Sequence, residues 1–150
     1  MAYKIEFRVH EDFLCFEIAG NISNHIDSLA AYVRHFIVEW RTQKVLLDVR
    51  NATGGPSPAK LFIHVLKYPP MHRIDCALID REPSRDFLVL YAKLMRHRGH
   101  RIRLSATVDE GAAWLMQARE PQVAPKKQSL RILQRLRQLI LPPGSVNVKA

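Results

Sequence analysis

Short apolar runs alternate with amphipathic helical stretches along most of the chain, and this alternation constrains the fold more than any other feature. KVLLDV (44–49) and IDCALI (74–79) are nearly continuous apolar runs of the length of buried strands, and RIRLSA (101–106) is a further strand candidate. The stretches between them place apolar residues three and four positions apart, as on one face of a helix. Strands separated by helices predict parallel crossover units, with helices packed on the sheet.

The start of the chain adds a predicted hairpin. Residues 3–9 alternate in polarity with period two, and the strand-like run FLCFEIAG (13–20) follows after a short polar stretch. The predicted order is β-β-α-β-α-β-α-β-α, a single α/β domain over residues 1–118 with a mixed sheet of about five strands, in which the hairpin is the antiparallel part. At 150 residues and 47% hydrophobic content, the chain is long enough for one substantial core.

Several residues are predicted to cap the helices or to lie on a buried helix face. Expected amino-terminal caps are Ser23 or Asn24, Ser57, Ser84 and Thr107, because their side chains accept hydrogen bonds from free backbone N–H groups. Thr107 also matches a capping box that ends at Glu110. In the helix after Ser57, the apolar residues expected to point inward are Leu61, Phe62, Val65 and Leu66.

Residues 119–150 are predicted to be a linker followed by a basic amphipathic helix. Within it, residues 121–150 hold six of the nine net positive charges and no acidic residue. Its apolar side is expected to pack on the domain or on a second subunit, and homodimerisation stays open. The alternative is that its cations contact an anionic membrane surface or an acidic partner. The residues concerned are Lys126, Lys127, Arg131, Arg135 and Arg137.

The composition also bears on cellular location. Cys15 and Cys76 each lie within an apolar run, so both are predicted to be buried thiols of a protein in a reducing compartment. The amino terminus has no apolar signal region, and no run approaches the length of a membrane-spanning helix. We therefore expect a cytoplasmic protein.

Sequence signatures of catalysis and metal binding are missing. The chain has no Gly-x-Ser-x-Gly elbow, phosphate-binding loop or His-Glu-x-x-His motif, so we expect neither an enzyme nor a cofactor. His97 and His100 are three residues apart, but neighbouring arginines oppose a divalent cation, and no metal site is predicted. The basic strip from Arg96 to Arg103, which contains these arginines, lacks interleaved aromatic residues, so nucleic acid is not an expected partner.

The chain resembles the STAS domain family of anti-sigma-factor antagonists, and in particular the STAS/Sec14-like branch of small bacterial proteins. The resemblance covers about residues 3–118 and is carried by FLCFEIAGNIS, KVLLDVRNA and RIRLSATVDEGAAWL. It implies a regulatory domain in which a serine at the start of the helix after the central strand is phosphorylated to control partner binding. The matching position here is Ser57 in TGGPSPAK, although the family usually has an Asp-Ser-Ser-Gly-like stretch there. Ser57 is interpreted as a helix cap, with a phosphorylation switch or an anion resting on the Gly54-Gly55 turn as alternatives.

Two functional hypotheses follow. The leading one is a non-catalytic STAS-like module that binds a protein partner through the loop and helix after the third strand. Its expected contact residues are Asn51, Thr53, Gly54, Gly55, Ser57 and Lys60. The alternative is a carrier or sensor of a lipid or small apolar ligand, with a tail that associates with the membrane surface. An apolar pocket between helix and sheet would favour the carrier, whereas a filled core would favour the interaction module.

Overall fold

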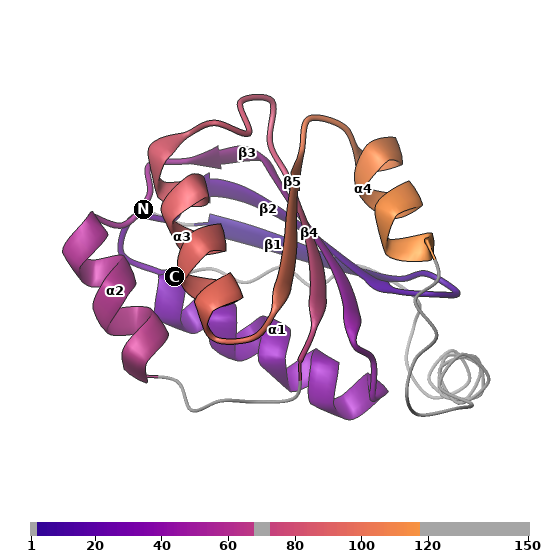
Figure 1. The fold of residues 1–150 in the computed structure, drawn as a ribbon. Coiled ribbons are helices and arrows are strands. Elements are labelled where there is room, and N and C mark those ends of the chain that lie inside the picture. The colour runs from indigo at the N-terminus through magenta and orange to yellow at the C-terminus, as the bar shows by residue number, and fades with distance from the viewer. Residues whose placement is uncertain (1–2, 68–72, 118–150) are drawn as a thin grey trace.

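The computed structural model describes residues 3–67 and 73–117, which form an α/β fold in the predicted order (Figure 1). The strands are β1 (Tyr3–Val9), β2 (Leu14–Asn21), β3 (Lys44–Thr53), β4 (Asp75–Ile79) and β5 (Arg101–Ser105). The helices are α1 (Ile26–Trp40), α2 (Pro58–Lys67), α3 (Asp86–His97) and α4 (Val108–Met116). The prediction of a mixed α/β sheet with helices on it is confirmed.

The strands lie side by side in the order β1-β2-β3-β4-β5. β1 and β2 pair antiparallel, as the predicted hairpin requires, and the other neighbouring pairs are parallel. α1, α2 and α3 lie on one side of the sheet, and α4 lies on the other (Figure 1). The sheet therefore has helices on both faces, which agrees with the nearly continuous apolar runs of β3 and β4.

Alternate residues of the central strands supply two separate cores. Val45 and Val49 of β3 belong to the larger core under α1 and α3, whereas Leu46 belongs to the smaller core under α4. The larger core is rich in aromatic rings: Phe7 and Phe36 stack with ring centroids 4.3 Å apart. These two cores hold the helices that frame the site described below.

The helix starts are partly as predicted. The Thr107 hydroxyl accepts the Glu110 N–H at 3.2 Å, and the Ser57 hydroxyl accepts the Lys60 N–H at 3.3 Å. The caps predicted at Ser23 or Asn24 and at Ser84 are wrong, because α1 follows His25 and α3 follows Arg85, without a side-chain cap in either case. The Ser23 hydroxyl instead accepts the Gly55 N–H at 3.1 Å, which joins the loop before α1 to the loop before α2.

The two cysteines differ in their surroundings. Cys76 is buried as predicted, but Cys15 is only half-buried, because its position in β2 points to the face that carries α4. Burial raises the pKa of the Cys15 thiol to about 11 and that of the Cys76 thiol to about 12, and nearby carboxylates act in the same direction. Both thiols are therefore protonated at neutral pH.

The predicted carboxy-terminal helix lies outside the described residues, together with its basic side chains Lys126, Lys127, Arg131, Arg135 and Arg137. Within the part of the chain that the structure describes, no helix has the length and apolar character needed to cross a membrane.

Candidate ligand-binding cavity

α1 and α3 form the two walls of an apolar cavity. From α1, residues at helical spacing face it: Ile26, Leu29, Ala30, Val33, Arg34 and Ile37. From α3, the facing residues are Phe87, Leu88, Tyr91 and Met95, and Arg98 follows directly after the helix. Ile37 comes eleven positions after Ile26, so the wall formed by α1 extends roughly 16 Å along the helix.

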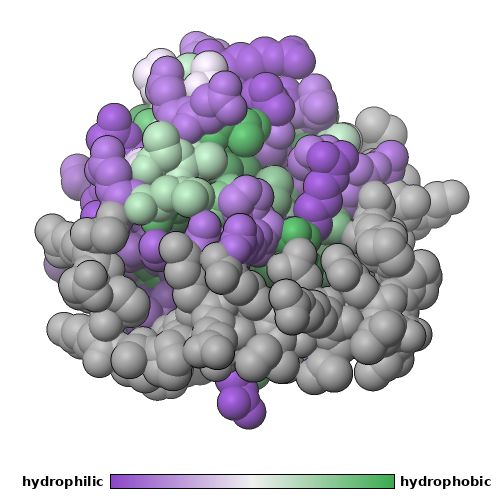
Figure 2. Space-filling view, turned by 90° about the vertical axis from the view of Figure 1, so that its right-hand side faces the viewer, coloured by the Kyte–Doolittle hydropathy of each residue, from purple (hydrophilic) through white to green (hydrophobic). Residues whose placement is uncertain are grey.

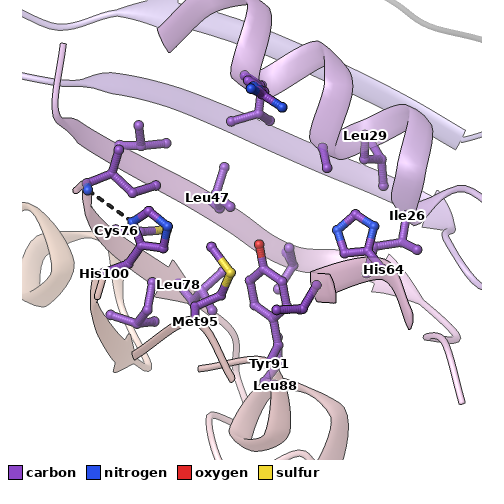
Figure 3. A pocket seen from close by; sticks show the side chains of 18 of the residues that line it. Ile26, Leu29, Leu47, His64, Cys76, Leu78, Leu88, Tyr91, Met95 and His100 are labelled. Atoms are coloured by element: carbon purple, nitrogen blue, oxygen red, sulfur yellow. Dashed lines mark hydrogen bonds between the residues drawn. The ribbon is translucent and has the colours of Figure 1, made fainter. Parts of the chain in front are cut away.

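The sheet forms the floor of the cavity, and α2 contributes at one end. The floor consists of side chains on one face of β2, β3, β4 and β5, namely Ile18, Val45, Leu47, Val49, Cys76, Leu78 and Ile102. His64 and Val65 of α2 complete the lining near Ile26 and Leu29, as Figure 3 shows for His64. The cavity is partly open to solvent, and its volume is about 160 Å³.

The position of α2 explains why this space is not filled. The helix of a β-α-β unit ordinarily packs over the two strands it connects, which here are β3 and β4. α2 instead packs mainly against α3. As a result, Leu47, on the helix-covered face of the central strand β3, is only half-buried and faces the cavity (Figure 3).

The same placement corrects the predicted inner face of α2. Leu61 and Val65 are buried as expected, but Phe62 is 51% exposed and Leu66 is 58% exposed. A helix with one neighbouring helix, and little sheet beneath it, can bury only a narrow stripe of side chains. Ile63, also in α2, is 62% exposed.

A histidine–aspartate pair joins α2 to α1 at one end of the cavity. His64 Nδ1 lies 2.5 Å from Asp27 Oδ1, and Lys67 Nζ lies 3.4 Å from Asp27 Oδ2. The hydrogen bond from His64 is the main cause that lowers the pKa of the Asp27 carboxyl below its ordinary value, and Lys67 adds to it. The His64 ring is almost fully buried, whereas the Asp27 side chain is half exposed.

A second histidine lies elsewhere in the lining. His100 is buried, and its Nδ1 accepts the Ile74 N–H at 3.2 Å (Figure 3). Because Nδ1 accepts this bond, the ring is the neutral tautomer with its proton on Nε2. Burial is the main cause that lowers the pKa of His100, and the Arg98 charge contributes, so the ring stays neutral at pH 7.

Tyr91 directs its hydroxyl into the cavity between Leu47 and His64 (Figure 3). Burial raises the pKa of this phenol above its usual range, with a smaller contribution from Cys76, so it is protonated at neutral pH. Among the described residues, nothing forms a hydrogen bond with the hydroxyl. Tyr91 is therefore a neutral donor available to a ligand in an otherwise apolar space.

The loop predicted as a partner contact lies at the carboxyl end of β3. Its residues Asn51, Thr53, Gly54, Gly55, Ser57 and Lys60 are brought together by the chain itself, and Ser57 is exposed. Gly55 has a φ of 150°, and a Cβ there would meet the Phe87 ring at 2.8 Å, so the turn approaches a cavity wall closely. The Lys60 ammonium donates to Asn24 Oδ1 at 3.2 Å. Partner binding or phosphorylation at this loop stays a prediction.

Sequence reasoning missed the polar residues of the cavity, above all Arg34, His64, Tyr91 and Arg98. One sequence signal could have pointed to Arg34, because this charged residue falls four positions after Ala30 on the otherwise apolar stripe of α1.

Within residues 3–67 and 73–117, no group of His, Cys, Asp or Glu side chains has an arrangement that would hold a metal ion.

The side of the molecule that carries α4 has a different character. There, hydrophilic side chains dominate the described surface and surround a smaller group of apolar ones (Figure 2). Arg101 of β5 stacks on the Trp114 ring of α4, with 5.1 Å between its guanidinium carbon and the ring centroid. The apolar cavity thus belongs to the side of the sheet that α1, α2 and α3 cover.

Comparison with solved structures finds chains of similar fold. The chain is similar to an uncharacterized protein from the DUF3478 family with a SpoIIAA-like fold from Shewanella loihica PV-4. The TM-score is 0.48 and the sequence identity 13%, over 77% of this chain and 95% of that one. No protein-family model and no curated protein matches the sequence.

Proposed function

We propose that this protein is a non-catalytic binding module that holds a small apolar ligand between α1, α3 and the sheet. The observation that carries the proposal is the cavity of about 160 Å³, whose lining is almost entirely apolar. An apolar cavity of about 150 Å³ is large enough to accept a six-carbon molecule such as benzene. A cavity of this kind is the feature that distinguishes a carrier or sensor of apolar ligands from a module with a filled core.

The expected affinity follows from the size of the cavity. Burying one methylene group contributes about 0.8 kcal/mol, so a six-carbon chain contributes at most about 5 kcal/mol. That free energy corresponds to a dissociation constant of the order of 1 mM or somewhat below. A ligand of this size would therefore be exchangeable, as a sensor or carrier requires.

The polar side chains of the lining support binding over catalysis. The Cys76 thiol has a pKa of about 12, so little of the nucleophilic thiolate is present at pH 7. His64 is hydrogen-bonded to Asp27, and His100 Nδ1 is occupied by a backbone N–H. Among the described residues that line the cavity, we find no activated nucleophile paired with a base.

Thermal unfolding of the full chain in the presence of 1-hexanol tests the proposal. A ligand that binds only the folded state raises the unfolding midpoint as its concentration rises above the dissociation constant. Ala30→Leu, which places a larger side chain in the cavity, should abolish this rise. Ala31→Leu is the matched control, because Ala31 is the exposed neighbour of Ala30 in α1 and does not line the cavity. An equal response of all three proteins, or no response, would argue against the cavity as the binding site.

The second candidate function is binding of a protein partner at the outer face of α2. The observation that favours it is the group of exposed apolar side chains Phe62, Ile63 and Leu66, beyond the Ser57 cap. Replacing Phe62 and Leu66 together by serine should abolish capture of a partner in pull-down experiments. Val89→Ser is the control, since Val89 is an exposed apolar residue of α3. Unchanged capture by the double variant would count against α2 as the contact surface.

A further inference from the structure

The described lining of the cavity contains a single side-chain oxygen, the hydroxyl of Tyr91. Every other described lining residue has a hydrocarbon, sulfur or nitrogen side chain, and none is Ser, Thr, Asn, Gln, Asp or Glu. The Tyr91 hydroxyl is directed into the cavity from α3, and it forms no hydrogen bond with another described residue (Figure 3). This part of the lining therefore offers a ligand one unpaired hydroxyl group and no carboxylate or amide oxygen.

The nitrogen-bearing side chains of the lining depend less on a ligand for their polar contacts. His64 and His100 each have a hydrogen-bond partner already, and Arg98 has an interaction of its own. Arg34 is half-buried beside a cavity that is partly open to solvent. An arginine can lay its aliphatic stem along apolar surface while its charged group stays in water. The Tyr91 hydroxyl is therefore the stronger indicator of the ligand.

The chemistry of this hydroxyl favours a ligand that accepts a hydrogen bond. Burial holds the pKa of Tyr91 above its usual range, so the hydroxyl keeps its proton at neutral pH and can donate. An alcohol can accept this bond, but the described lining has no second side-chain oxygen to accept from the alcohol's own O–H. A buried donor without a partner is costly, whereas a carbonyl group has no donor to leave unpaired. A carbonyl oxygen thus complements Tyr91 better than an alcohol does.

We propose that the natural ligand is an uncharged carbonyl compound of about six carbon atoms, such as a ketone or an ester, whose carbonyl oxygen accepts a hydrogen bond from Tyr91. This inference rests on the proposed function and narrows its ligand class. The hydrocarbon part of the ligand lies against Leu47 and Met95, which line the same cavity (Figure 3). An alkylammonium ion of the same size has no lone pair to accept the hydrogen bond and is excluded on that ground.

NMR titration of the full chain at pH 7 tests this class with three six-carbon probes: 2-hexanone, benzene and hexanoate. The dissociation constants are obtained from the methyl signals of Leu47 and Met95, which line the cavity. Tyr91→Phe, which removes only the hydroxyl, should weaken binding of 2-hexanone about fivefold, the effect of one hydrogen bond between neutral groups. Benzene has no oxygen, so its binding should not change, which also shows that the variant is folded. Hexanoate should bind more weakly than 2-hexanone, because burying its charge is costly.

Tyr32→Phe is the matched control. The Tyr32 hydroxyl is also buried and forms no hydrogen bond among the described residues. Tyr32 does not line the cavity, however, and its ring packs against Phe16 and Phe36 on another side of α1. This variant should keep the full affinity for 2-hexanone.

The possible results separate this inference from the proposed function. Equal losses of 2-hexanone affinity in the Tyr91 and Tyr32 variants, or no loss in the Tyr91 variant, would overturn the role of Tyr91 while the apolar-ligand function stands. Tighter binding of hexanoate than of 2-hexanone would overturn the uncharged class. If neither benzene nor 2-hexanone bound to the unaltered protein, the proposed function itself would fail.

Discussion

Replacing Ala30 by leucine should stabilise the protein, although enlarging a residue in a helix–sheet interface ordinarily destabilises it. Ala30 is half-buried in α1 and lines the cavity. Leucine adds three carbon atoms, which would contribute up to about 2.4 kcal/mol if all of them were buried in empty space. Because the side chain is only half-buried, we expect a gain of about 1 kcal/mol. Alanine and leucine differ little in helix propensity, so the backbone contributes almost nothing.

Urea unfolding of the full chain measures this change. With a denaturant slope of about 2 kcal/mol/M, a gain of about 1 kcal/mol raises the midpoint by about half a molar. The control is Ala92→Leu in α3, because Ala92 is fully buried and its new side chain has no space to enter. That variant should lose about 1–3 kcal/mol. If Ala30→Leu lost as much stability as Ala92→Leu, the space beside Ala30 would not be a cavity.

Three further predictions concern other parts of the molecule. His64 lowers the pKa of Asp27 below its ordinary value of 3.8, so the stability that this carboxylate contributes is present at neutral pH and is lost as the pH falls through the folded-state pKa. In thermal unfolding measured between pH 7 and pH 2, Asp27→Asn should therefore weaken the loss of stability in acid. An unchanged pH profile would contradict this role of the His64–Asp27 pair. Gly111→Ala should destabilise the protein by about 1–3 kcal/mol in urea unfolding, because the new Cβ would lie 2.4 Å from Ile79 Cδ1. Adding Ile79→Val to this variant should recover part of the loss, because valine lacks that Cδ1 atom. Ser57→Ala should cost about 1 kcal/mol in the same assay by removing the cap, whereas Ser57→Asp should keep most of the stability; equal losses would show that the cap contributes nothing.

The order of the elements was predictable because it depends on local patterns. The period-two alternation of residues 3–9 and the apolar runs of β3 and β4 are set by how strands expose their two faces, and each is legible within a few residues. Thr107 was likewise recognisable as a cap, since its partner, the Glu110 N–H, is three residues away. Ser23 could not be interpreted in this way, because its hydroxyl bonds to Gly55, which is 32 residues away.

The cavity depends on relations that no local pattern contains. The apolar spacing of Leu61, Phe62, Val65 and Leu66 predicts a buried helix face, but it does not indicate whether the sheet or another helix covers that face. Because α2 packs mainly against α3, the floor around Leu47 is left open.

The central claim, that this cavity binds a small apolar molecule, is tested most directly by methyl-group NMR of the full chain during titration with 1-hexanol. The methyl signals of Val33, Leu47 and Met95, which line the cavity, should shift progressively and saturate near millimolar concentration. Those of Leu46 and Leu115, in the core under α4 on the other face of the sheet, should stay in place. Shifts of equal size on both faces, or no saturable shift at the cavity methyl groups, would contradict the account.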